Sequence, residues 1–167
     1  AVSKALLAYL VEECSFQSVQ KDADGTHVQV KEPVSGDAIL FEVSYNILEF
    51  VFEKALTIQE IDQRFKRYLE LIQSYLRKHH HELQGWGVHP HWKINDNRPV
   101  ALPRYQMLLA YLALSQKEQA GAFHDYPDYG AFICGNQVQL DISEKNLIPV
   151  LNRFNQLEPI KAYLFKK

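Results

Sequence analysis

Residues 38–50 read Ala-Ile-Leu-Phe-Glu-Val-Ser-Tyr-Asn-Ile-Leu-Glu-Phe, an apolar stretch that holds two carboxylates seven positions apart. The alternation of residue types up to Ser44 predicts a β-strand. Glu42 and Glu49 would lie on opposite faces of one regular strand, because successive side chains alternate between faces. A bulge or turn at residues 44–46 would bring both to the same face. A site shared by the two glutamates therefore predicts an irregular backbone at this point.

Carboxylates in an apolar stretch need a compensating environment. Burying an unpaired charge costs several kcal/mol or more. Each glutamate therefore points to solvent from a one-sided sheet, pairs with a cationic side chain, or binds a metal ion. From these residues alone, exposure to solvent is the most common outcome.

The segments around this stretch alternate between strand and helix patterns. Residues 26–31 and 38–44, separated by turn residues 33–37, predict a hairpin, and residues 2–14 predict a helix. Thr57 and Glu60 have the capping-box spacing, and Ile58, Ile61, Phe65, Leu69, Ile72 and Leu76 then form one helical stripe. Further on, residues 86–89 predict a short strand, residues 104–114 a helix, residues 131–142 a strand interrupted by Gly135, and residues 143–157 a helix capped by Ser143.

This order of elements lacks the regular strand-helix alternation of a doubly wound sheet. It predicts an α+β fold, with an antiparallel sheet and helices packed on one face. The length of 167 residues, with 47% hydrophobic and 23% charged residues, suits a single globular domain over residues 1–167. We therefore expect a folded domain with a substantial core.

Charge and cysteine content narrow the expected partners and compartment. The formal net charge of -2, from 18 basic and 20 acidic residues, gives no excess field that would attract nucleic acid or an anionic membrane. Cys14 and Cys134 are too few for a disulfide scaffold, which favours a reducing cytoplasm. No apolar run approaches the roughly 20 residues that span a bilayer, so we expect a soluble protein.

Two further groups of polar residues are candidate site residues. Gln137, Gln139 and Asp141 would share one face of the predicted strand, where they could ligate a hard cation or hold an amino acid. An exposed sheet face gives the same pattern, and from sequence alone it is the more frequent explanation. Arg104 opens a predicted helix and is well placed to bind a carboxylate or phosphate, although a surface arginine would look the same.

Histidines gather in the middle of the chain, at residues 79–81, 89 and 91. Consecutive histidines at a helix end point in different directions, which disfavours a zinc or nickel site. No Walker loop, dinucleotide glycine motif, nucleophile elbow or His-Glu-Xaa-Xaa-His pair occurs in the chain. The sequence therefore gives no support to the common motif-marked mechanisms.

Taken in order, the segments from residue 38 to residue 167 resemble the middle of glutamate-cysteine ligases, especially the plant and proteobacterial type. That family has a carboxylate-bearing strand before a long helix, to which residues 42–50 and the helix from Thr57 are similar. Its Gly-Xaa-Gly loop with Pro and Trp, and its Pro-Arg-Tyr helix start, are similar to residues 85–92 and 103–105. Its Cys-Xaa-Xaa-Gln-Val-Xaa-Leu-Asp and Leu-Xaa-Pro-Ile-Xaa-Ala-Xaa-Leu-Phe segments match residues 134–141 and 157–165.

The resemblance implies a glutamine-synthetase-like fold and an ATP-dependent ligase that forms γ-glutamylcysteine, the first step of glutathione synthesis. ATP would phosphorylate the γ-carboxyl of glutamate, with Mg²⁺ bridging carboxylates and phosphates, before the amine of cysteine attacks. Such chemistry depends on positioning and charge neutralisation. By resemblance, the metal ligands are Glu42, Glu49 and Gln137, and the substrate-binding residues are Arg104, Tyr105, Gln139, His89 and Trp92.

Departures from the family pattern imply that this chain carries only part of the site. The family's Gly-Xaa-Glu-Xaa-Glu strand would precede the first helix, and the arginines and acids that complete its nucleotide site would follow Phe165. Residues 43–47 also replace the family's Gly-Gly-Gln. Two alternatives remain open: a non-catalytic module that binds an amino acid or metal, and a subunit whose open sheet edge is covered by a second copy or another partner.

Overall fold

The computed structural model describes residues 2–117, 126 and 128–165. These residues belong to two compact units, Ala1–Gly135 and Asn136–Lys167, and each unit is considered by itself. The prediction of one domain over residues 1–167 stays a prediction.

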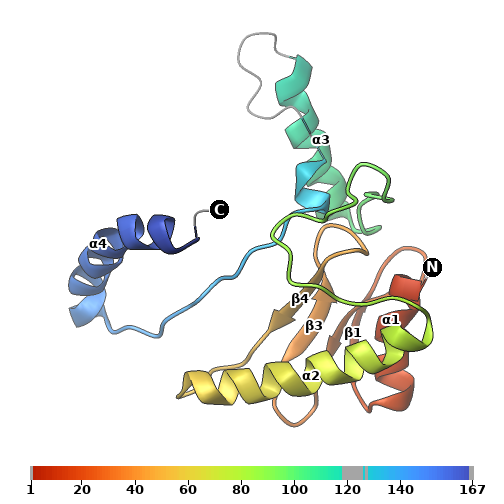
Figure 1. Cartoon of the computed structure of the whole chain (residues 1–167), viewed down its shortest axis with the longest axis horizontal. Helices are drawn as coiled ribbons and strands as arrows, with labels where there is room; N and C mark the ends of the chain where they lie inside the picture. The colour runs from red at the N-terminus through yellow and green to blue at the C-terminus, as the bar shows by residue number, and fades with distance from the viewer. Residues whose placement is uncertain (1, 118–125, 127, 166–167) are drawn as a thin grey trace. The chain divides into compact units, whose positions relative to one another are not determined.

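A four-stranded antiparallel sheet forms the centre of the first unit (Figure 1). Its strands follow one another in chain order as β1 (Gln17–Lys21), β2 (His27–Lys31), β3 (Ala38–Phe41) and β4 (Leu48–Val51). The predicted hairpin is confirmed as β2 and β3, which pair with Lys31 opposite Ala38. In its turn, Gly36 has a φ of 78°, a conformation that favours glycine. Together with the four α-helices of the described residues, this sheet confirms the predicted α+β class.

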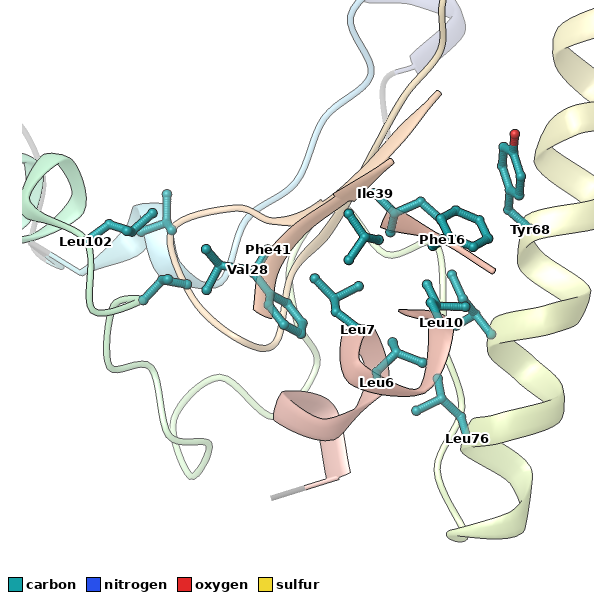
Figure 2. Packing of buried hydrophobic residues seen from close by; sticks show 14 of the residues in the cluster. Leu6, Leu7, Leu10, Phe16, Val28, Ile39, Phe41, Tyr68, Leu76 and Leu102 are labelled. Atoms are coloured by element: carbon teal, nitrogen blue, oxygen red, sulfur yellow. The ribbon is translucent and has the colours of Figure 1, made fainter. Parts of the chain in front are cut away.

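Two helices, α1 (Val2–Glu13) and α2 (Ile58–Lys78), pack on one face of this sheet. Both were predicted from their periodicity. Figure 2 shows Leu6, Leu7 and Leu10 of α1 gathered with Ile39 and Phe41 of β3 in one cluster. The same face receives the fully buried side chains of β2 and α2: Val28, Val30 and Ile72. Removing these side chains from water supplies the main driving force for folding this unit.

The opposite face of the sheet, which we call the open face, is more polar. Strand pairing places Gln29, Leu40 and Glu49 side by side across β2, β3 and β4. Gln29 and Glu49 are half-buried. Because Ile39 and Phe41 point to the helix side, their neighbours in β3 must point to the open face. The sheet thus separates an apolar face from a polar one.

Helix α2 begins as the sequence predicts. The Thr57 hydroxyl accepts a hydrogen bond from the Glu60 backbone N–H at 3.3 Å. The predicted apolar stripe is buried only toward its C-terminal half, at Ile72 and Leu76, together with Tyr68. Ile58 in the first turn is 78% exposed. The core therefore holds α2 mainly by its last three turns.

The helix predicted at residues 104–114 is confirmed as α3 (Pro103–Lys117). The strand predicted at residues 131–142 is wrong. A 3₁₀ turn, η1 (Tyr129–Ala131), occupies its start, and an isolated bridge joins Ile133 to Val88, the one paired position of the short strand predicted at residues 86–89. Residues 134–143 have no regular structure. Their alternating pattern finds no partner strand among the described residues, and without ladder hydrogen bonds alternation does not make a strand.

The second unit contains a 3₁₀ turn, η2 (Glu144–Asn146), and helix α4 (Leu147–Phe165). The helix predicted at residues 143–157 is confirmed and continues further. The helix begins at Leu147, however, and Ser143 makes no side-chain cap: its backbone carbonyl accepts the Asn146 N–H at 2.9 Å in the 3₁₀ turn that precedes α4. In the part of the chain that the structure describes, no helix is long and apolar enough to cross a membrane.

Candidate functional site

The stretch that predicts an irregular backbone forms two strands joined by a turn at residues 42–47. The Glu42 N–H donates to the Ile47 carbonyl at 3.1 Å, and the Ile47 N–H donates to the Ser44 carbonyl at 3.3 Å. Val43 has a φ of 57°, which costs a β-branched residue roughly 1–3 kcal/mol. The predicted break in the strand is therefore confirmed, and it is a strained turn between β3 and β4.

Contacts from distant parts of the chain hold this turn in place. The Val100 N–H donates to the Val43 carbonyl at 2.7 Å, and the buried Ser44 hydroxyl donates to the Ala131 carbonyl at 2.7 Å. The Asn46 side-chain amide donates to the Asp96 carbonyl at 2.6 Å. Surrounding structure must impose a strained conformation of this kind, and such conformations are frequent at functional sites.

The turn brings the two glutamates to the open face. Glu49 lies opposite Leu40, and Glu42 follows Leu40 by two residues, so both carboxylates project from the same side of the sheet. Burial raises the pKa of Glu49, and the neighbouring charge of Glu42 raises it further, with a smaller opposing effect of Arg104. Two carboxylates that repel each other in this way are stabilised by a bound cation or by a proton.

Helix α3 adds a cation and a phenol beside this pair. The Arg104 guanidinium lies 3.6 Å from the Glu42 carboxylate and 4.3 Å from the centre of the Tyr105 ring. The Tyr105 hydroxyl donates to Glu42 Oε2 at 2.8 Å. Arg104 keeps 58% of its side chain exposed. Its guanidinium can therefore meet an anionic ligand at the open face.

The donor set fits a hard divalent cation with an open coordination sphere. Among the described residues, no group of three or more His, Cys, Asp or Glu side chains could enclose a metal ion. Mg²⁺ commonly binds proteins through one or two carboxylates and takes its other ligands from phosphates and water. Glu42 and Glu49 supply two carboxylates, so they suit Mg²⁺ bound together with a phosphate-bearing substrate.

Comparison with known protein families identifies the family of the chain. Residues 8–165 match the model of glutamate-cysteine ligase family 2. The chain belongs to this family. No characterised protein and no solved structure was found to match it. Membership makes the chain a carboxylate-amine ligase of the glutamate-cysteine ligase type, and it confirms the resemblance carried by the ordered motifs of the sequence.

Of the residues predicted to bind substrate in this ligase, two lie in the loop before α3 and make internal contacts. The Trp92 ring stacks on Phe132 with 4.7 Å between ring centres. The His89 N–H donates to the Phe132 carbonyl at 2.8 Å, and burial lowers the pKa of the His89 imidazole, with a further contribution from His91. These contacts order the loop. A direct role of His89 and Trp92 in binding substrate stays a prediction.

Gln137 and Gln139 belong to the second unit of the ligase chain. Both are exposed and lie in the segment without regular structure, so the shared strand face on which they were placed does not form. Whether Gln137 joins Glu42 and Glu49 as a metal ligand, and whether Gln139 contacts substrate, stay predictions.

The sequence does not predict a supporting contact between Tyr45 and Asp22. The Tyr45 hydroxyl donates to the carboxylate of Asp22, which is 8% exposed, and it accepts the Ala101 N–H at 3.3 Å. Burial and the Asp22 carboxylate raise the pKa of Tyr45 to about 12. The contact ties the turn that carries Glu42 to the β1–β2 hairpin. No local pattern signals it, because its two partners are 23 residues apart in the chain.

Proposed function

We propose that this chain supplies a cation site and an anion site of an ATP- and Mg²⁺-dependent ligase that joins the γ-carboxyl of glutamate to the amine of cysteine. The ligase class follows from family membership, and the substrates and the use of ATP are the proposal. The observation that carries it is the Glu42–Glu49 pair beside Arg104 on the open face of the sheet. Glutamate and cysteine are its proposed small-molecule partners.

The carboxylate pair is the proposed cation site. When Mg²⁺ is bound, it neutralises negative charge on carboxylate and phosphate oxygens. Glu49 has a raised pKa because of burial and of Glu42, so charge repulsion between these side chains favours their joint binding to a cation. Their half-buried position also strengthens this attraction relative to a fully exposed pair.

Arg104 is the proposed anion contact. A guanidinium can form two parallel hydrogen bonds with a carboxylate or with a phosphate. The side chain lies in the first turn of α3, where the helix dipole adds positive potential. An anionic substrate held here would lie next to the cation held by Glu42. This adjacency is what phosphoryl transfer to a carboxylate requires, because the reaction brings several negative groups together.

Calorimetric titration of Mg²⁺, ATP and glutamate into the whole chain tests the proposal. We expect Mg²⁺-dependent, saturable ATP binding in the original chain and its loss in Glu49→Gln, which keeps the size of the side chain but removes its charge. Glu70→Gln is the matched control, since Glu70 is an exposed glutamate of α2, away from the pair. Absence of binding in the folded chain, or equal binding in Glu49→Gln, would contradict the proposal.

A further inference from the structure

Tyr105 stands between the two charged side chains of the proposed site. Its hydroxyl accepts a hydrogen bond from the Arg104 guanidinium and donates one to Glu42 Oε2 at 2.8 Å. Its ring supports the same guanidinium, with 4.3 Å between the Arg104 carbon Cζ and the ring centre. One phenol therefore contacts both the Glu42 carboxylate and the Arg104 guanidinium.

Tyr105 is itself firmly held. It is 3% exposed, and its ring belongs to the main hydrophobic cluster together with Val100 and Leu102. The Tyr105 N–H donates to the Leu102 carbonyl at 3.1 Å. A buried ring with few rotamers is a rigid support for the groups that it contacts. So little of Tyr105 reaches solvent that a ligand on the open face would meet Arg104 and Glu42 first.

We infer that Tyr105 is a positioning residue, which fixes the Glu42 carboxylate for the cation and the Arg104 guanidinium for the anion without itself contacting substrate. This role rests on the proposed function of the pair and Arg104. The hydroxyl acts on Glu42 through a charge-assisted hydrogen bond, whereas Arg104 is held by the hydroxyl and by stacking on the ring. Removing the hydroxyl therefore removes the whole contact with Glu42 but only part of the support of Arg104, because the ring remains.

Two substitutions separate them. Tyr105→Phe removes the hydroxyl and keeps the ring, so we expect Mg²⁺ affinity to fall roughly tenfold or more, as for other groups that orient metal ligands. Glutamate affinity should fall by less than about threefold, because the ring still supports Arg104. Tyr105→Leu removes both features and should weaken both ligands. Tyr111→Phe on the same helix, 69% exposed, is the control and should change neither affinity.

Calorimetry with MgCl₂ alone and with glutamate alone measures the two affinities, and thermal unfolding of each variant monitors the fold. The inference predicts unequal losses in Tyr105→Phe and a fold as stable as that of the control variant to within a few degrees. Unchanged Mg²⁺ affinity in Tyr105→Phe overturns the positioning role alone. Equal losses accompanied by a lower melting temperature also overturn it, because they indicate a purely structural residue. Absence of Mg²⁺ binding in the original chain overturns this role and the proposed function together.

Discussion

Strand β3 has an acidic residue at each end, and the two ends differ in how fully the carboxylate is satisfied. Asp37 immediately precedes the strand and is 1% exposed. It accepts hydrogen bonds from the Tyr68 hydroxyl at 2.6 Å, the Glu53 N–H at 2.8 Å and the Arg64 guanidinium at 3.3 Å. Burial alone would raise the pKa of Asp37, but these donors outweigh it and hold the pKa below its usual value.

Glu42 immediately follows the same strand and has fewer partners. Tyr105 and Arg104 approach it from one side, while Glu49 adds a second negative charge. The pKa of Glu49 is raised, in contrast to that of Asp37. The carboxylate at the start of the strand is satisfied within the fold, whereas in the proposed function the pair at its end retains charge for a ligand to neutralise.

Replacing Asp37 by alanine should produce the largest effect on stability. Asp37→Ala removes the acceptor of the Glu53 N–H and one of the partners of the Tyr68 hydroxyl and of the Arg64 guanidinium, which should cost about 3 kcal/mol or more of unfolding free energy. Urea unfolding measures this loss. Asp62→Ala, at a surface ion pair with Lys66, should cost less than about 0.5 kcal/mol. Similar losses in both variants would show that Asp37 stabilises the fold no more than a surface ion pair does.

The negative charge of Asp37 supplies part of this stabilisation, and the dependence of stability on pH measures that part. Because its folded pKa is lowered, its contribution is present above the unfolded value of about 3.9 and is lost as pH falls through the folded pKa. Stability of the original chain should therefore decrease below about pH 4 more steeply than that of Asp37→Asn. Glu32 also has a lowered pKa and is present in both proteins, so the stability of Asp37→Asn should still decrease at low pH, but less steeply. Parallel pH profiles would contradict this prediction.

The two buried tyrosines allow a sharper comparison of the two ends. Tyr68→Phe removes the donor to Asp37 and should lower the unfolding free energy by about 1–2 kcal/mol without changing Mg²⁺ affinity. Tyr105→Phe should weaken Mg²⁺ binding and leave the unfolding free energy nearly unchanged. Chemical unfolding gives the unfolding free energy of each variant, and calorimetry gives its Mg²⁺ affinity. Equal changes of stability and of Mg²⁺ affinity in the two variants would show that the two ends of β3 do not differ in function.

Glu49→Gln should change the stability of the fold least, and the change should be an increase. The raised pKa of Glu49 means that its charged form is disfavoured in the folded state, so its removal should raise stability at pH 7 by up to about 1 kcal/mol. At a pH well below 4 the gain should disappear, because Glu49 is then protonated in both states. Thermal unfolding at the two pH values measures it. A loss of stability at pH 7 would indicate that Glu49 is a structural residue.

The elements that the sequence predicts well are those whose signal is local. The helix from Thr57 has a cap and a periodic apolar stripe, and both the cap and the last turns of the stripe appear in α2. Glu42 and Glu49 are seven positions apart, so they can share one face of the sheet only if the strand is interrupted between them, and the turn at residues 42–47 interrupts it. These inferences need only the spacing of residues along the chain.

The failures involve contacts that local patterns do not encode. Strand β1 was missed because it contains one apolar residue, Val19, and is exposed along its length. Residues 131–142 alternate like a strand but find no ladder partner among the described residues. In the site, anion binding by Arg104 stays a prediction, and the contact of Arg104 with Glu42, 62 positions away in the chain, could not be derived from spacing.

Paramagnetic broadening of NMR signals tests directly whether Glu42 and Glu49 form a cation site. Mn²⁺ prefers the same oxygen ligands as Mg²⁺ and broadens NMR signals of nearby nuclei. Substoichiometric Mn²⁺ added to the isotope-labelled chain should broaden the backbone signals of Glu42, Glu49 and Tyr105 first, and excess Mg²⁺ should restore them. Broadening centred on another acidic segment, such as residues 22–24, or the same broadening in Glu49→Gln, would contradict a cation site at Glu42 and Glu49.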